Sequence, residues 1–152
     1  MIRVAFASPQ DAVVIDRSLM RRAARAVLAG EGVKNAQISL AFVDNPTIQR
    51  LNRRYLKHNR PTDVLSFPLG DTNDQMLSGE IVIGAEVAAA EANRRGQDLQ
   101  AEAALYVIHG VLHLCGLDDK TRAGAAEMRL RESHYLRQLG LPDIATSPNP
   151  SA

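Results

Sequence analysis

Residues 103–115 read Ala-Ala-Leu-Tyr-Val-Ile-His-Gly-Val-Leu-His-Leu-Cys, a run that is apolar on nearly every side of a helix. A helix without a polar face must be covered by its neighbours, so we expect this run to form the buried central helix of the domain. Asp98 is suited to begin the helix. Gly116 is suited to end it, because glycine readily adopts the left-handed conformation found at helix ends.

Two histidines, His109 and His113, lie four residues apart within this run. At 3.6 residues per turn they stand one above the other on the same helix face. The turn at Gly116 lets Asp119 approach that face from the far side. Two imidazole nitrogens and one carboxylate oxygen form an open site that suits Zn²⁺ and leaves a fourth position for water. We therefore expect His109, His113 and Asp119 to hold a catalytic metal ion.

The adjacent carboxylate, Asp118, has three open roles: it caps the next helix, hydrogen-bonds to a metal ligand, or accepts a proton. An alternative for the whole pattern is an ordinary buried helix followed by two aspartates that only cap the next one. We expect one of the two aspartates to form that cap and favour Asp119 as the ligand.

Position 110 bears on the type of reaction. Zinc proteases carry His-Glu-x-x-His, in which the glutamate deprotonates the metal-bound water. Gly110 stands in place of that glutamate, which disfavours peptide hydrolysis. Non-haem iron oxygenases also use two histidines and a carboxylate, but nothing else in the chain indicates an oxygen-handling pocket.

Length and composition fit one domain with a genuine core, since the chain has 152 residues of which 45% are hydrophobic. We expect the domain over residues 1–141 and a loose tail over 142–152. No apolar run is long enough to cross a bilayer and the N-terminus lacks the layout of a secretory signal, so we expect no membrane association and a cytoplasmic location. The single cysteine, Cys115, agrees with a reducing compartment and is expected to pack as a small apolar residue.

Strands and helices are mixed irregularly along the chain, which predicts a single α+β domain with a small mixed sheet of about four strands packed against several helices. Strands are expected at 2–6, 37–43, 64–67 and 79–83, with Pro68 ending the third. A polar loop over 70–78 joins the last two and favours their antiparallel pairing. Helices are expected at 16–29, 46–57, 85–95, 98–115 and 121–139. The first of them turns Arg17, Arg21 and Arg25 outward.

Positive charge is concentrated in one segment, although the net charge of the chain is only +1. The segment from Arg50 to Arg60 holds five fixed positive charges and no acidic residue. The basic residues that share one helix face, or follow it, are Arg50, Arg53, Arg54, Lys57 and His58. Such a face is either a solvated outer surface or a track for phosphates, and the metal motif favours the track.

Three motifs occur together and in order: 61–67 Pro-Thr-Asp-Val-Leu-Ser-Phe, 79–83 Gly-Glu-Ile-Val-Ile, and 109–118 His-Gly-Val-Leu-His-Leu-Cys-Gly-Leu-Asp. This combination resembles the YbeY family of bacterial metal-dependent endoribonucleases, over the chain from about Val43 to Tyr135. The resemblance implies a zinc site on the central helix and cleavage of single-stranded RNA. It further implies maturation of the 3′ end of 16S rRNA and ribosome quality control, with the small ribosomal subunit as partner and no obligatory small-molecule cofactor.

The chain departs from the family pattern at two positions. The third family ligand is usually histidine, and Asp119 in its place broadens the choice of metal toward harder ions such as Mn²⁺. The family also tends to carry arginine after the tyrosine that precedes the Pro-Thr-Asp motif, whereas Leu56 follows Tyr55 here. If that arginine holds the scissile phosphate, its role passes to Lys57, His58 or Arg60. We favour Arg60, because it adjoins the Pro61-Thr62 turn.

Three classes of function follow from these features. A metal-dependent endoribonuclease is favoured, with Asp118 as the proton acceptor nearest the metal and Arg60 as the group that holds the scissile phosphate. The alternatives are a metallohydrolase of a substrate such as a peptide, and a ribosome-associated RNA-binding module in which the metal is structural.

Overall fold

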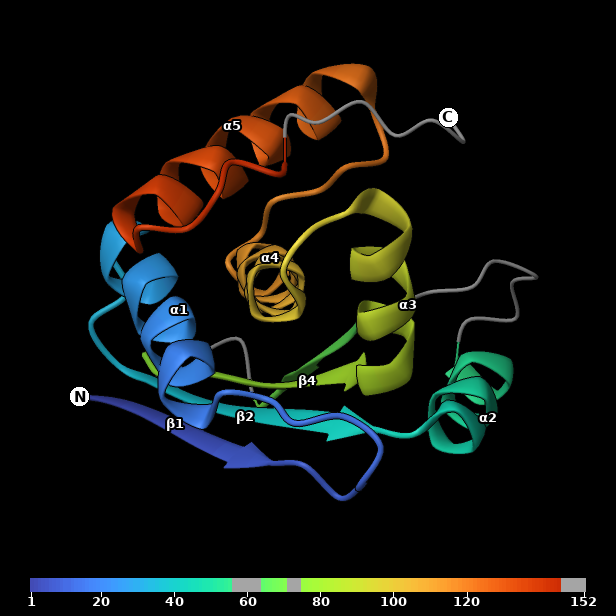
Figure 1. Ribbon diagram of the computed structural model, residues 1–152. Helices are drawn as coiled ribbons and strands as arrows, with labels where there is room; N and C mark the ends of the chain where they lie inside the picture. The colour runs from blue at the N-terminus through green and yellow to red at the C-terminus, as the bar shows by residue number, and fades with distance from the viewer. Residues whose placement is uncertain (56–63, 71–74, 146–152) are drawn as a thin grey trace.

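The computed structural model describes residues 1–55, 64–70 and 75–145. These residues form one α+β domain in which helices pack on a small mixed sheet, as predicted (Figure 1). The strands are β1 (Ile2–Ala7), β2 (Ala36–Val43), β3 (Val64–Leu69) and β4 (Leu77–Gly84). The helices are α1 (Arg17–Gly30), α2 (Asn45–Tyr55), α3 (Ala85–Arg95), α4 (Leu99–Leu114) and α5 (Arg122–Gln138).

The sheet has the strand order β1-β2-β4-β3, with β1 and β3 at its two edges. The strands β1, β2 and β4 are parallel, and β3 pairs antiparallel with β4, which confirms the pairing predicted for these two strands. Along β2, buried Ile38, Leu40 and Phe42 alternate with more exposed neighbours. This period of two is typical of a strand with one face against the core.

The predicted limits of β3 and β4 were wrong. Strand β3 continues through Pro68, which lies opposite Gly79, and does not stop before it. Proline cannot donate to a ladder of hydrogen bonds, but an edge strand tolerates it because one side of the strand needs no donor. Strand β4 begins at Leu77, inside the segment predicted to be loop.

Helix α4 lies at the centre of the domain, enclosed by α1, α3, α5 and the sheet (Figure 1). Its residues are buried from Ala101 to Ile108, including Glu102, whose carboxylate lies 3.1 Å from the Arg95 guanidinium. The side chain of Asp98 accepts a hydrogen bond from the Ala101 amide and begins the helix, as predicted. Because α4 touches so many elements, side chains near its C-terminal end are held in fixed positions.

Helix α2 packs on the other face of the sheet from α4. Its Ile48 lies in a second, smaller cluster with Val43, Leu65 and Val82. The neighbours of Val82 in β4, Ile81 and Ile83, belong instead to the main core around α4. Successive side chains of a strand point to opposite faces, so α2 and α4 lie on opposite sides of β4.

The segment after α5 packs partly on the domain. Ile144 is buried, and its carbonyl accepts a hydrogen bond of 2.5 Å from the Arg95 guanidinium. Thus the first residues of the predicted tail contact the core, whereas residues 146–152 lie outside the described part of the chain. None of the helices in the described residues is both long enough and apolar enough to cross a membrane.

Candidate metal centre

The C-terminal end of α4 turns back through Gly116, which has a φ of +102°. The Gly116 amide donates to the His113 carbonyl at 3.0 Å and the Leu117 amide donates to the Leu112 carbonyl at 3.1 Å. This pair of bonds defines a Schellman motif, whose left-handed residue is most often glycine. The motif reverses the chain and brings Asp119 to the face of α4 that carries both histidines.

Three side chains meet at this turn: His109, His113 and Asp119. The two Nε2 atoms are 3.0 Å apart, and each lies 3.8 Å from an oxygen of Asp119. One ligand atom from each residue lies within 4.8 Å of the other two. Tetrahedral ligands at about 2.0–2.2 Å from zinc are separated by about 3.3–3.6 Å, so the observed donor set fits a single divalent ion.

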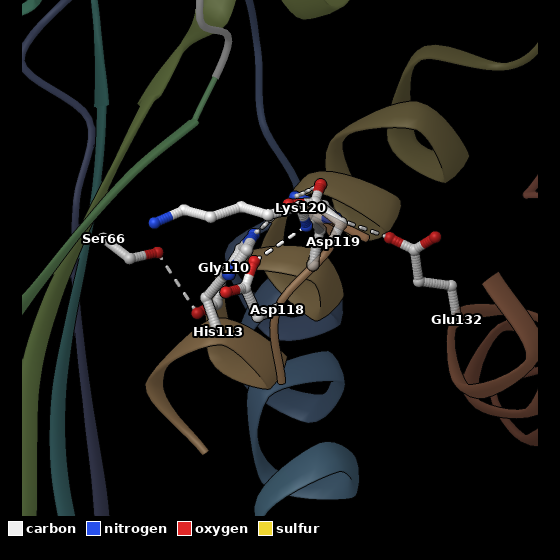
Figure 2. Close-up of polar contacts among 8 residues, drawn as sticks. Ser66, Gly110, His113, Asp118, Asp119, Lys120 and Glu132 are labelled. Atoms are coloured by element: carbon white, nitrogen blue, oxygen red, sulfur yellow. Dashed lines mark hydrogen bonds and ion pairs between the residues drawn. The ribbon is translucent and has the colours of Figure 1, made fainter. Parts of the chain in front are cut away.

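Glu132 reaches the centre from α5, on the side opposite Ser66 (Figure 2). Its Oε2 atom lies 2.7 Å from Nδ1 of His109, and the residue is only 7% exposed. A carboxylate in this position accepts the Nδ1 proton and leaves Nε2 free to bind a metal. Glu132 was not among the site residues predicted from the sequence. The sequence pattern that could have indicated it is a charged residue at a core-facing position of α5, four residues after Met128 and three before Tyr135, both of which are buried.

The two histidines have opposite pKa shifts. Burial lowers the pKa of His109, but the hydrogen bond and charge of Glu132, together with Asp119, outweigh burial, so the pKa is raised. For His113, burial and the nearby His109 lower the pKa. At a given pH, a larger fraction of His113 is therefore neutral and able to bind a metal. His109 keeps its proton up to a higher pH, and a metal that binds below that pH must displace it.

Gly110 lies where α4 approaches the sheet most closely. A Cβ atom at this position would lie 2.8 Å from Cγ2 of Ile81 and 3.2 Å from Oγ of Ser66. The Ser66 hydroxyl donates to the Gly110 carbonyl at 3.2 Å, which ties β3 to α4. No side chain, and so no catalytic glutamate, fits at this position without a shift of the sheet.

A pocket opens beside the centre and is lined by β3 and by the loop after α4. Its lining includes Ser66, Phe67, His109, His113, Asp119 and Lys120. The Lys120 side chain extends from the loop toward the β3 side of the pocket (Figure 2). One carboxylate oxygen of Asp118 accepts a 2.8 Å hydrogen bond from the Lys120 amide, which fixes Asp118 next to the ligands. Lys120 was not among the predicted site residues.

The predicted helix cap was wrong. Helix α5 begins after Thr121, whose hydroxyl accepts a hydrogen bond of 2.9 Å from the Gly124 amide, and neither Asp118 nor Asp119 caps it. The extra residues of loop before α5 carry Asp119 back to the histidines. Cys115 packs at the margin of the core, and burial raises the pKa of its thiol to about 11, as expected for a residue that behaves as a small apolar group.

The predicted RNA-binding residues are only partly described. Arg50, Arg53 and Arg54 are exposed on α2, which lies on the opposite side of the sheet from α4. Lys57, His58 and Arg60 lie outside the described residues, as does Leu56, and nothing is described of the Tyr55 side chain. Consecutive residues of β3, from Val64 to Pro68, line the pocket, and two of them, Leu65 and Phe67, also belong to the α2 cluster, so the two regions meet at this edge of the sheet.

Comparison with known proteins gives a consistent result. Residues 7–140 match the sequence profile of the family described as Endoribonuclease YbeY. A protein named Endoribonuclease YbeY from Carboxydothermus hydrogenoformans is 42% identical over 87% of this chain and 94% of its own length. One of the same name from Pelotomaculum thermopropionicum is 39% identical over 87% and 93%. A solution structure of a Thermotoga maritima protein shares the fold, with a TM-score of 0.59 at 21% identity over 100% of this chain and 99% of that one.

Proposed function

Because the chain belongs to the YbeY family of endoribonucleases, we propose that it cleaves single-stranded RNA at a divalent metal ion held by His109, His113 and Asp119. The observation that carries this proposal is the convergence of their three donor groups at the end of α4. The preferred ion is Zn²⁺, with Mn²⁺ as the alternative that the carboxylate ligand permits. A bound ion would polarise a phosphoryl oxygen and acidify a coordinated water.

Glu132 acts in this proposal by fixing His109. Its carboxylate accepts the Nδ1 proton, so that the ring presents Nε2 toward His113 and Asp119. The pair is largely shielded from water, since the Glu132 side chain is 9% exposed and that of His109 is 29% exposed. A carboxylate that holds an imidazole in this way selects its tautomer and makes it a stronger donor toward a metal.

Two residues of the loop after α4 are proposed to act on the substrate. Asp118, held beside the ligands by the Lys120 amide, accepts the proton of the attacking hydroxyl group, which belongs to a water or to the substrate's 2′-carbon, as its oxygen bonds to phosphorus and the bond to the leaving ribose oxygen breaks. Lys120, which lines the pocket, binds a non-bridging oxygen of the scissile phosphate and offsets its charge. Gly110 has no side chain to serve as the base, which leaves this role to the loop.

Arg60 remains our proposal for a second phosphate ligand. In the sequence it adjoins the Pro61-Thr62 pair and precedes Val64, the first residue of β3, by four residues. Arg50, Arg53, Arg54, Lys57 and His58 are proposed to bind flanking phosphates as the RNA passes around the β3 edge. The proposed substrate in the cell is 16S rRNA near its 3′ end, in the cytoplasm and on the small ribosomal subunit.

The test is cleavage of a labelled single-stranded RNA by the purified protein, with and without a chelator. We expect cleavage that is lost on chelation, restored by Zn²⁺ or Mn²⁺, and abolished in His113→Ala. The matched control is His134→Ala, which removes an exposed histidine of α5 outside the pocket.

Two results would refute the proposal. Digestion of casein without cleavage of RNA would indicate a peptide hydrolase. RNA binding that is insensitive to chelator and never leads to cleavage would indicate a binding module with a structural metal. Circular dichroism of each variant separates loss of function from loss of fold.

A further inference from the structure

The outer face of α1 carries a concentration of positive charge that the metal centre does not use. Arg17, Arg21, Arg22 and Arg25 are all exposed and, with Ser18, line a shallow depression in the surface. The opposite face of α1 is buried in the core. Residues 17–30 contain no acidic side chain, although the chain as a whole has nearly equal numbers of acidic and basic residues.

Three of these side chains, Arg17, Arg21 and Arg25, form what we call the arginine row, and each is anchored on the edge strand β1. The Arg21 Nε donates to the Val4 carbonyl at 3.0 Å, and an Arg25 Nη1 donates to the Ile2 carbonyl at 3.1 Å. The Arg17 guanidinium lies over the Phe6 ring, 5.5 Å from its centroid. Each contact leaves most of the five guanidinium N–H groups available to a ligand.

None of the four arginines forms an ion pair with a carboxylate anywhere in the described part of the chain. Arginines elsewhere do: Arg95 pairs with Glu102, and Arg131 pairs with Glu31 and Glu127. Covering the backbone of an edge strand would account for one donor on Arg21 and one on Arg25. It accounts for neither the remaining donors nor Arg22, which forms no hydrogen bond to β1 among the described residues.

We propose that the arginine row, with Arg22, is a second surface for the phosphate backbone of single-stranded RNA. Successive members lie four residues apart, or about 6 Å along the helix, so the row spans about 12 Å. Guanidinium groups suit phosphate because they offer paired donors, and their anchoring on β1 reduces the entropy lost on binding. The contacts reach no base, so this binding is independent of sequence.

The position of the row complements that of the metal pocket. The row lies over β1 at one edge of the sheet, and the pocket is lined by β3 at the other edge. Three strand spacings separate these edges, or about 14 Å. A strand of RNA held at both places would be gripped at a fixed distance from the site of cleavage. This inference rests on the proposed function only for the choice of RNA as ligand.

The experiment measures binding of a fluorescein-labelled single-stranded RNA of about 20 nucleotides to the whole chain in EDTA, where cleavage is suppressed. The test variant is Arg17→Gln, Arg21→Gln, Arg25→Gln. The control variant, Lys34→Gln, Arg129→Gln, Arg137→Gln, changes the net charge equally at exposed positions outside both surfaces. A third variant replaces the three row arginines by lysine and keeps the charge.

We expect the row variant to bind at least 10-fold more weakly than the control variant at low salt. The slope of log affinity against log salt should fall by about 2, since each contact to a single strand contributes about 0.7. The lysine variant, which keeps the charge, should have a salt dependence of binding close to that of the unaltered protein. Equal affinities for the row and control variants would overturn the inference, as would row-dependent binding to phosphatidylglycerol vesicles but not to RNA.

The outcomes separate this inference from the proposed function. Row-dependent RNA binding by a protein that never cleaves RNA would support the inference and refute the proposed function. Chelator-sensitive cleavage together with row-independent binding would do the reverse.

Discussion

Replacing Glu132 by glutamine should weaken metal binding without unfolding the protein. Glutamine has nearly the same shape and its amide oxygen can still accept the His109 Nδ1 proton, but the negative charge is lost. The contact is short, at 2.7 Å, and the carboxylate is 91% buried by side-chain area, so solvent screens it little. Loss of a carboxylate behind a metal-binding histidine typically costs 10–100-fold in affinity. We expect about 10-fold for glutamine and about 100-fold for alanine, or about 1.4 and 2.7 kcal/mol.

The assay is competition for Zn²⁺ with a chromophoric chelator, followed by ¹⁵N spectra of the His109 ring in metal-free protein. The control is Glu127→Gln on the same helix, because Glu127 is 50% exposed, pairs with Arg131 and lies outside the pocket. Zn²⁺ binding by Glu132→Gln as tight as that of Glu127→Gln would contradict this role of Glu132, as would an unchanged His109 tautomer in Glu132→Ala, which removes the acceptor altogether.

Further predictions concern pH, packing and thiol reactivity. In metal-free protein, the raised pKa of His109 gives stability that is full below its unfolded value of about 6.5 and is lost as pH rises through the native value. Urea unfolding should therefore show a larger loss in Glu132→Gln at about pH 6 than at about pH 9, and an equal loss at both would contradict the assignment. Gly110→Ala should lower the free energy of unfolding by about 1–3 kcal/mol because the new Cβ meets Ile81; a gain, as at an exposed helix position, would show that the sheet yields. Alkylation of Cys115 by iodoacetamide near neutral pH should be about 100-fold slower in native than in urea-unfolded protein, since the pKa of its thiol rises from 9.0 to about 11 and less thiolate is present. Comparable rates in the two states would show that the fold does not raise this pKa.

The sequence was sufficient to predict features that depend on neighbouring residues. Local rules predicted that α4 begins at Asp98, that its helical period puts His109 and His113 on one face, and that the chain turns back at Gly116. Together these features predicted that Asp119 would converge with the two histidines. The alternation of β2 and the antiparallel pairing of β3 with β4 are of the same kind.

Features that depend on packing between distant segments were not predicted. Glu132 lies 23 residues after His109 on a different helix, and only the packing of α5 against α4 brings them together. The continuation of β3 through Pro68 depends on its position at the sheet edge, which the local sequence does not reveal. Both Asp118 and Thr121 are good helix caps by residue type, and the choice between them depends on where Asp119 must lie.

The division of the proposed ligands between a helix and a loop has a kinetic consequence. His109 and His113 belong to α4, which cannot shift without disturbing most of the core, whereas the Asp119 side chain is 44% exposed on the loop that follows. Release of the exposed aspartate would therefore open the site first, and an ion could then dissociate from the two fixed imidazoles without unfolding of α4. Metal exchange would then be fast in a protein that unfolds slowly, and restraining the loop would lengthen the residence time of the ion without altering which atoms hold it.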